Sequence, residues 1–211
     1  MAPHLLYIAD PMCSWCWGFS PIIDTVRDHF GSQLPMQLLM GGLRPGTDEP
    51  MTFGMKAEIK GHWEHVHKAT GQPFNFAFFD GGEFVYDTEP PSRAVVAVRR
   101  LEPELAFEFL KNVQKAFYAQ NRDVTDPEVL TGIAADLVLD QEAFNAEFKA
   151  GQTITETWRD FETSRHMGVT GFPTLLAGSK EDSYEVITAG YRPWEAVKEM
   201  IEGWKERIGD R

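Results

Sequence analysis

The chain has 211 residues but only two cysteines, and it has neither a long apolar run nor an excess of basic side chains. No stretch approaches the roughly 20 apolar residues that a membrane-spanning helix needs, which argues against a membrane protein. The net charge is −12, from 20 Lys and Arg against 32 Asp and Glu, and it argues against binding to nucleic acid or to an anionic membrane. Hydrophobic residues make up 43% of the chain, which predicts a folded, globular protein.

The N-terminus, Met1-Ala2-Pro3-His4, also lacks the basic region and the long apolar core of a secretory signal peptide. The short apolar segment behind it runs directly into the two cysteines. We therefore expect a cytoplasmic protein, in which reducing thiol pools disfavour a purely structural disulfide.

The two cysteines stand together in Cys13-Ser14-Trp15-Cys16, after a predicted strand and before a predicted helix. Dithiol–disulfide exchange centres have this C-x-x-C spacing. The first Cys lies at the helix N-terminus, where unpaired N–H groups and the helix dipole favour a thiolate. The second lies about one turn further on, close enough to attack a mixed disulfide formed at the first.

Two apolar runs on either side of a helix predict the start of an α/β fold. Leu5–Ala9 and Met36–Met40 predict buried strands, and the segment 13–30 between them has a helical apolar face. Pro21 lies inside this helix, and Gly31 is expected to end it. We expect the two strands to be parallel, as in a βαβ unit.

The middle of the chain, from about Thr52 to Gly151, has helical periodicity throughout. Predicted helices cover 53–70, 92–101 with Ser92 as its cap, 104–120, 127–139 and 140–149. The last part predicts a helix over 153–167 that opens on a Thr153–Glu156 capping box, strands over 174–177 and 184–189 around a polar turn at 179–182, and a helix over 193–208. The sequence thus predicts an α/β domain in two pieces, 1–50 and 152–211, with a helical insertion at 51–151.

Two motifs together make the chain resemble the thioredoxin fold. Pro21 follows Cys16 by five positions, and the segment 168–176, Gly-Val-Thr-Gly-Phe-Pro-Thr-Leu-Leu, is similar to the thioredoxin segment that carries a cis-proline. The long helical stretch between the motifs resembles the DsbA family, in which a helical domain interrupts a thioredoxin fold. The segment 10–19, with Glu89-Pro90 and Arg93-Ala94, is similar to the signal-less branch of that family, the predicted protein-disulfide isomerases. The resemblance covers essentially the whole chain.

The resemblance implies a role for each site residue. Cys13 would be the nucleophile and Cys16 the thiol that resolves the mixed disulfide. Pro173 would be a cis-proline facing the pair, in a loop whose backbone can pair with an extended substrate. Phe172 and Trp15 would contact substrate, and Ser14 completes the motif.

The chain departs from the family at three positions. Ser14 and Trp15 replace the proline and histidine of the periplasmic DsbA, so the Cys13 thiolate would depend mostly on helix-end amides. A weaker preference for the thiolate gives a less oxidising disulfide, which suits a reductase or isomerase better than an oxidase. Tyr7 occupies the strand position at which thioredoxin and DsbA carry a buried acid, and Asp10 is the nearest carboxylate that can replace it.

Plainer interpretations exist for these residues and their neighbours. The cysteines could be inert core residues or half of a metal site, but the second ligand pair is missing and the proline loop matches. Three histidines, His62, His65 and His67, are predicted to form a solvated helix face rather than a metal site. Arg93 fits a salt bridge better than a ligand contact, and ordinary packing is the alternative for Trp15 and Phe172.

The first functional hypothesis is a cytoplasmic thiol–disulfide oxidoreductase that acts on a protein or small-molecule disulfide. It needs no metal or resident cofactor, and glutathione is a candidate thiol co-substrate. Two alternatives stay open. One is a glutathione-dependent transferase or isomerase of the kappa type, although such relatives typically have serine at the position of Cys13. The other is an adaptor that delivers a regulator to a protease and senses redox state through the cysteine pair.

Overall fold

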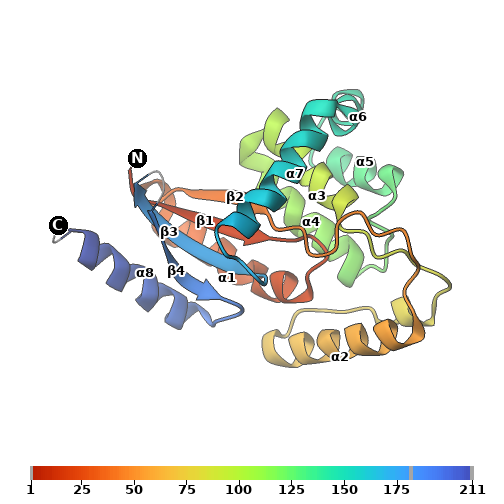
Figure 1. The fold of residues 1–211 in the computed structure, drawn as a ribbon, viewed down its shortest axis with the longest axis horizontal. Helices are drawn as coiled ribbons and strands as arrows, with labels where there is room; N and C mark the ends of the chain where they lie inside the picture. Colours follow the sequence, from red (N-terminus) through yellow and green to blue (C-terminus); the bar gives the residue numbers. More distant parts are fainter. Residues whose placement is uncertain (1, 181–182, 210–211) are drawn as a thin grey trace.

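A computed structural model describes residues 2–180 and 183–209 (Figure 1). The strands are β1 (His4–Ala9), β2 (Met36–Met40), β3 (Thr174–Lys180) and β4 (Ser183–Ala189). The helices are α1 (Ser14–Phe30), α2 (Phe53–Thr70), α3 (Glu89–Leu101), α4 (Ala106–Tyr118), α5 (Pro127–Asp136), α6 (Gln141–Lys149), α7 (Gly151–His166) and α8 (Trp194–Gly209). Short 3₁₀ helices η1 (Gly31–Gln33), η2 (Phe76–Asp80) and η3 (Pro103–Leu105) connect some of them.

Both ends of the chain build one four-stranded sheet in the order β2-β1-β3-β4, and the helices α3 to α7 lie together beside it (Figure 1). β1 is parallel to β2 and antiparallel to β3, which in turn is antiparallel to β4. The predicted α/β fold with a helical insertion is therefore confirmed, while the domain limits at residues 50 and 151 stay a prediction. None of the described helices has the length and apolar character required to span a membrane.

The first strand, helix and strand form the predicted parallel unit. Every residue of β1 is buried, as its apolar run requires. α1 begins at Ser14, one residue later than predicted, because Cys13 is its extended N-cap residue. Gly31 ends α1 with a φ of 49°, in the left-handed region that favours glycine.

The core divides between the two faces of the sheet. Leu5 and Tyr7 of β1 point into the larger cluster, which includes residues of α1, α8 and the middle helices. Leu6 and Ile8 point to the other face, where Met167 and the segment after α7 cover a smaller cluster. This alternation places Tyr7 on the same side of the sheet as the helix that follows the cysteine motif.

The helical periodicity predicted for the whole middle region is wrong for residues 71–88. α2 covers the predicted 53–70, but the chain then forms only η2 and an extended segment in which Val85 bridges to Pro50. The phenylalanines of this segment have apolar spacing because they surround the buried ring of Trp63, not because they share a helix face. Those in contact with Trp63 are Phe74, Phe76, Phe78 and Phe79.

The predicted start of the second middle helix is also wrong. α3 begins at Glu89, and its two prolines fit the first turn because the N–H groups there need no helical acceptor. Ser92 is buried inside the helix, where its N–H donates to the carbonyl of Thr88. The carboxylate of Asp87 instead accepts the N–H of Glu89, at 2.9 Å, and so provides a hydrogen-bond acceptor for the first N–H group of the helix.

Two further boundaries in the middle region move by a few residues. The predicted 104–120 helix is η3 followed by α4, which ends at Tyr118. α5 ends at Asp136 rather than 139, because Val138 adopts a left-handed φ of 62°.

The capping box predicted at Thr153 and Glu156, for the helix over 153–167, is wrong as well. α7 begins at Gly151, so Thr153 lies in its first turn. The Thr153 hydroxyl donates to Glu147 of α6, and Glu156 pairs with arginines of α3. These long-range partners replace the local pairing that the sequence pattern predicts.

The C-terminal elements follow the prediction with small shifts. β3 extends past Ala177 to Lys180, β4 begins one residue earlier than predicted, and α8 runs one residue later at each end. The predicted polar turn at 179–182 lies partly outside the described residues.

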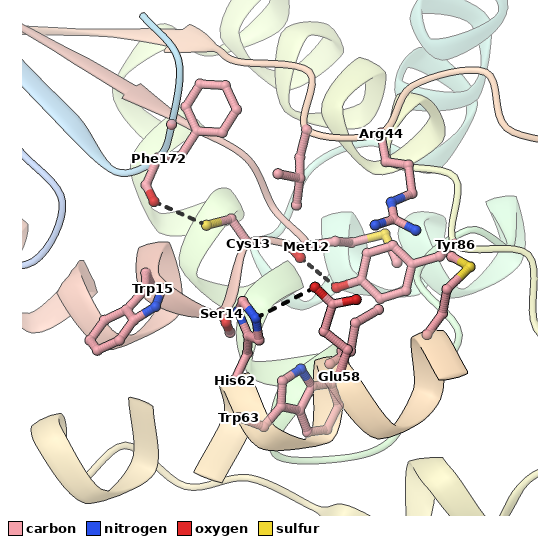
Figure 2. A pocket seen from close by; sticks show the side chains of 14 residues that line it. Met12, Cys13, Ser14, Trp15, Arg44, Glu58, His62, Trp63, Tyr86 and Phe172 are labelled. Atoms are coloured by element: carbon pink, nitrogen blue, oxygen red, sulfur yellow. Dashed lines mark hydrogen bonds and ion pairs between the residues drawn. The ribbon is translucent and has the colours of Figure 1, made fainter. Parts of the chain in front are cut away.

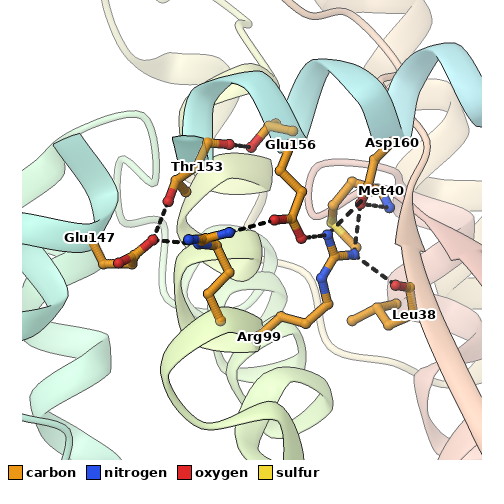
Figure 3. A network of polar contacts seen from close by, with 9 residues as sticks. Leu38, Met40, Arg99, Glu147, Thr153, Glu156 and Asp160 are labelled. Carbon is orange, nitrogen blue, oxygen red and sulfur yellow. Dashed lines mark hydrogen bonds and ion pairs between the residues drawn. The ribbon is translucent and has the colours of Figure 1, made fainter. Parts of the chain in front are cut away.

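A group of ion pairs joins the helices to the edge strand β2 (Figure 3). Arg99 of α3 binds Asp160 and Glu156 of α7, each at 2.7 Å. Arg99 also donates to the carbonyl of Leu38, and Asp160 accepts the N–H of Met40. The outer edge of β2 therefore has side-chain hydrogen-bond partners where a further strand would otherwise bind.

Candidate active site

The turn after β1 brings the two cysteines to the start of α1. The carbonyl of Asp10 accepts the N–H of Cys13 at 3.2 Å. The buried Asp10 carboxylate accepts the N–H groups of Met12, at 2.9 Å, and of Leu43, at 2.7 Å. Asp10 thus fixes both the turn before the cysteines and the loop after β2.

Cys13 and Cys16 are free thiols in different surroundings. Cys13 is 7% exposed and Cys16 is 0% exposed. The Cys13 carbonyl accepts the N–H groups of Cys16 and Trp17, at 3.0 and 3.1 Å, and so starts the helix. Among the described residues no side chain caps α1, and no acidic residue occupies its first turn, so Cys13 lies at an uncapped helix N-terminus.

The proline loop faces the first cysteine as predicted (Figure 2). The Phe172–Pro173 peptide bond is cis, which confirms that part of the resemblance. The Cys13 thiol donates to the carbonyl of Phe172, with 3.4 Å between sulfur and oxygen. Gly41, just after β2, makes room for the Phe172 ring, because a Cβ there would lie 2.1 Å from a ring carbon.

Cys16 is the more deeply buried of the two cysteines. Burial raises the pKa of Cys16 well above that of a free thiol, and the hydrogen bond and charge of the Cys13 sulfur raise it further. Cys16 therefore stays protonated until a nearby group takes its proton.

A cavity of about 280 Å³ opens beside Cys13 (Figure 2). Its volume is close to the lower end of the roughly 300–1,000 Å³ range of small-molecule sites. Three predicted site residues besides Cys13 lie in its wall, namely Ser14, Trp15 and Phe172, whereas Cys16 and Pro173 lie outside it. The structure thus brings the predicted residues together at one place.

Several residues of this cavity were missed by the sequence reasoning: Met12, Leu43, Arg44, Met55, Glu58, Ile59, Trp63, Tyr86 and Gly171. One signal could have found the loop residues. Parallel strands end at the same edge of a sheet, so the segment after β2 had to lie near the segment after β1, which carries Cys13. No comparable signal placed α2 or Tyr86 here.

The cavity wall carries polar groups suited to a charged ligand. Among the described residues, no carboxylate forms an ion pair with the exposed Arg44 guanidinium, which lies 5.8 Å from the centre of the Tyr86 ring. The indole N–H of Trp63 is fully buried and has no hydrogen-bond partner in the same part of the chain. Glu58 adds a negative charge at the α2 side of the cavity.

Tyr86 supports the cysteine turn from the opposite side. Its hydroxyl donates to the carbonyl of Met12 at 2.6 Å, next to Cys13 (Figure 2). Burial raises the pKa of Tyr86, so it stays protonated and keeps this hydrogen bond.

Tyr7 and Asp10 are the two groups that could replace the buried acid of thioredoxin and DsbA. The side chain of Tyr7 is buried, and its hydroxyl faces the sulfur of Cys16. Burial raises the pKa of Asp10 to about 6, although hydrogen bonds from Leu43 and Met12 oppose this. Both oxygens of Asp10 already accept backbone N–H groups.

The other residues singled out from the sequence have ordinary contacts. The three histidines of α2 are exposed; His62 lies 4.0 Å from Glu58 at the cavity, and His67 bonds to the Gln72 carbonyl. The described residues contain no group of three or more potential metal ligands. Arg93 forms the expected ion pair, with Glu89 at 3.1 Å. Trp15 is half-buried against Tyr191, with 6.0 Å between ring centres.

Comparisons with known proteins agree with this geometry. The family model described as thioredoxin matches residues 6–199. The crystal structure of a proposed protein disulfide isomerase from Nitrosomonas europaea has 38% sequence identity and a TM-score of 0.92, over 98% of this chain and 99% of the other. The cytosolic disulfide reductase DsbM from Pseudomonas aeruginosa has 26% identity and a TM-score of 0.78, over 96% and 98% of the two chains.

A curated relative has a different role. The ClpXP adapter protein SpxH from Bacillus subtilis is 23% identical over 98% of this chain and 68% of its own length. The thioredoxin match covers most of the sequence, and the interrupted sheet and cis-proline loop are those of the DsbA group. The chain therefore belongs to the thioredoxin family, within its DsbA-like group.

Proposed function

We propose that this chain is a thiol–disulfide oxidoreductase that reduces or isomerises disulfides through a mixed disulfide at Cys13, which Cys16 resolves. The observation that carries the proposal is the difference between the two thiols. Cys13 lies at the cavity beside the Phe172 carbonyl, whereas Cys16 is fully buried one helical turn behind it. A substrate sulfur can therefore reach Cys13 first, and only Cys16 is placed to release it.

The reaction takes two exchange steps. The Cys13 thiolate attacks a sulfur of the substrate disulfide, and the other substrate sulfur leaves as a thiolate. Cys16 then loses its proton and attacks the Cys13 sulfur. This forms the Cys13–Cys16 disulfide, breaks the mixed disulfide and releases the second substrate thiol. Two electrons pass to the substrate.

The cavity favours glutathione as the thiol that restores the dithiol. The exposed Arg44 guanidinium can bind a carboxylate, and Glu58 can bind an ammonium group, so the wall suits a small zwitterionic thiol. DsbM, 27% identical in this comparison, has been crystallised with glutathione. One glutathione would open the Cys13–Cys16 disulfide by attack on Cys13, and a second would release the first as glutathione disulfide. No metal or resident cofactor takes part.

The net direction we propose is reduction or isomerisation in the cytoplasm. DsbM is a cytosolic reductase, and the N. europaea structure is that of a proposed isomerase. The Ser14-Trp15 pair gives the Cys13 thiolate no imidazole partner, which supports a less oxidising centre than that of the periplasmic DsbA.

Reduction of insulin disulfides with glutathione as donor tests the chemistry. Cys13→Ser should abolish turnover, and Cys16→Ser should accumulate a mixed disulfide at Cys13 that mass spectrometry detects. Full turnover by Cys13→Ser would refute the assigned nucleophile.

Arg44→Gln tests the donor site. It removes a charged hydrogen-bond donor worth about 1.5–3 kcal/mol, so kcat/KM for glutathione should fall about ten- to a hundredfold. The uncharged donor β-mercaptoethanol should be used at the wild-type rate. Arg207→Gln is the matched control, because it removes the charge of another exposed arginine, which lies on α8 and pairs with Glu185 of β4. An equal loss with both donors would argue against carboxylate binding.

The SpxH relatives support a second candidate, a protein-binding adaptor. In that case binding to a partner protein should persist in a Cys13→Ser/Cys16→Ser variant that has no redox activity. The transferase alternative stays untested, and conjugation of a model electrophile to glutathione by Cys16→Ser protein would favour it.

A further inference from the structure

A second, much smaller cavity lies between α1 and α4, beside Tyr7 of β1. Its volume is about 10 Å³, close to the roughly 10–15 Å³ that one water molecule requires. Its polar wall consists of Tyr7 on β1, Ser20 and Asp24 on α1, and Lys111 and Gln114 on α4. The larger cavity beside Cys13, here called the glutathione cavity, shares none of these residues.

Two polar atoms in this wall need a hydrogen-bond partner. The Tyr7 hydroxyl and the Gln114 amide nitrogen are buried, at 2% and 1% residue exposure, and neither has a partner within the described ranges. Buried polar groups are rarely left unpaired. The hydroxyl of Ser20 donates to the Trp17 carbonyl and accepts from Gln72, and within the described ranges it forms no hydrogen bond with either atom. A water molecule in the cavity would satisfy both atoms.

The wall of this cavity includes Tyr7, which lies next to the buried thiol, and the ion pair of Asp24 with Lys111, which lies at the surface. At one end the Tyr7 hydroxyl faces the Cys16 sulfur, which is only a weak acceptor. At the other end Asp24 forms an ion pair with Lys111, and their side chains are 35% and 39% exposed. The remaining titratable groups that act on Tyr7 or Cys16 are Cys13, which lines the glutathione cavity, and Asp10, which bonds to Met12 and Leu43 in the wall of that cavity.

We propose that Tyr7, Gln114 and a water molecule between them form a proton path from Cys16 to Asp24. The inference rests on the proposed function, since Cys16 needs this path only to resolve a mixed disulfide. As the Cys16 sulfur attacks Cys13, its proton passes to the Tyr7 oxygen while the Tyr7 proton passes to the water. The water gives a proton to the Asp24 carboxylate, which exchanges it with solvent. The departing thiolate takes a proton from solvent at the other cavity, so no charge accumulates inside.

Asp10 is less suited to this task despite its raised pKa. Its two carboxylate oxygens hold the turn and the loop through backbone N–H groups, and both hydrogen bonds would weaken on protonation. The path through Tyr7 instead uses a hydroxyl and an amide nitrogen that have no hydrogen-bond partner in the part of the chain that the structure describes.

The two exchange steps can be timed separately with the chromogenic disulfide dithiobis(nitrobenzoate) at one equivalent in stopped flow. Attack by Cys13 releases the first nitrothiobenzoate, and attack by Cys16 releases the second. Tyr7→Phe should leave the first release unchanged and slow the second at least about tenfold near neutral pH. The deficit should narrow as pH rises, because hydroxide replaces the missing path.

Two further variants distinguish a proton path from simple packing. Gln114→Leu leaves the Tyr7 ring in place but removes the other unpartnered atom, so it should slow the second release by severalfold with the same pH dependence. Ser164→Ala is the control, since its buried hydroxyl also has no hydrogen-bond partner among the described residues but lines neither cavity. It should release both chromophores at wild-type rates.

The outcomes separate this inference from the proposed function. The path would be overturned if Tyr7→Phe showed the wild-type rate of the second release at every pH. It would also be overturned if Tyr7→Phe slowed the second release while Gln114→Leu left it at the wild-type rate. First release by Cys13→Ser at the wild-type rate would instead overturn the assigned nucleophile and, with it, the function.

Discussion

Substituting Gly41 by alanine tests whether the proline loop lies where the structure places it. Gly41 follows β2, and its N–H donates to the Ala9 carbonyl at 2.8 Å. An alanine Cβ at this position would lie 2.1 and 2.3 Å from two ring carbons of Phe172. Carbon atoms in contact prefer about 3.5–4.0 Å, so the Phe172 ring must move by more than about 1 Å.

The size of the effect follows from this overlap. Forcing extra volume into a packed site costs about 1–3 kcal/mol of unfolding free energy, and in a chain of this size each kcal/mol lowers Tm by about 2–4 °C. We therefore expect Tm to fall by about 2–12 °C. Because the Phe172 carbonyl contacts the Cys13 thiol, the displaced loop should also lower turnover about ten- to a hundredfold.

Calorimetry and disulfide reduction measure the two effects, and Gly61→Ala on α2 is the control. An added Cβ at Gly61 meets nothing within 4 Å, so alanine there should stabilise the helix by up to about 1 kcal/mol. In a Phe172→Ala background, Gly41→Ala should cause little further loss of unfolding free energy, because the ring that the added Cβ would meet is gone. Wild-type Tm and turnover in Gly41→Ala, or an unchanged cost without the ring, would refute the placement.

Three further predictions concern the supports of the site. Burial raises the pKa of Asp10 to about 6, so its contribution to stability is complete below pH ~4 and is lost as pH rises to ~6, by about 3 kcal/mol. Urea unfolding at several pH values should therefore show that the unfolding free energy of the wild type falls by about this much relative to that of Asp10→Asn between pH ~4 and ~6. The same pH dependence of unfolding free energy in both proteins would contradict this prediction. Arg99→Met leaves Asp160 buried and unpaired and should cost about 3–5 kcal/mol, against about 0–1 for Arg100→Met; equal losses in urea unfolding would contradict the network. Tyr86→Phe leaves the Met12 carbonyl without its 2.6 Å donor and should cost about 1–3 kcal/mol by the same assay, while an unchanged midpoint would show that this hydrogen bond contributes little.

Local pattern was sufficient for the parts of the fold that local physics decides. The buried run of β1, the limits of β2 and the end of α1 at Gly31 are set by residues close in sequence, and each agrees with its prediction within one residue. The prediction that β2 is buried is wrong in part, because this edge strand has only Leu38 and Met40 fully buried. The cis bond at Pro173 was predicted only through the resemblance, because most X–Pro bonds in folded proteins are trans.

Long-range contacts explain the failures. Thr153 and Glu156 have the spacing of a capping box, but charged partners from α6 and α3 bind them more strongly than the helix end does. Residues 71–88 are apolar at helical intervals because Trp63, from another helix, gathers their rings. No pattern within one segment can show either event.

The same limit applies to the site. The sequence identified Cys13, Cys16, Phe172 and Pro173, which lie in two compact motifs. It did not identify Arg44 or Trp63, since their role depends on loops and helices that meet only in the folded chain.

The side chains that bind the edge of β2 have a consequence for how the molecule can move and associate. An uncovered strand edge is a template for strands of other chains and promotes aggregation. Because Arg99 and Asp160 occupy the Leu38 carbonyl and the Met40 N–H, swinging the helices away from the sheet would uncover that template (Figure 3). Widening the cavity between α2 and the proline loop would leave this edge covered, because neither Arg99 nor Asp160 lines it.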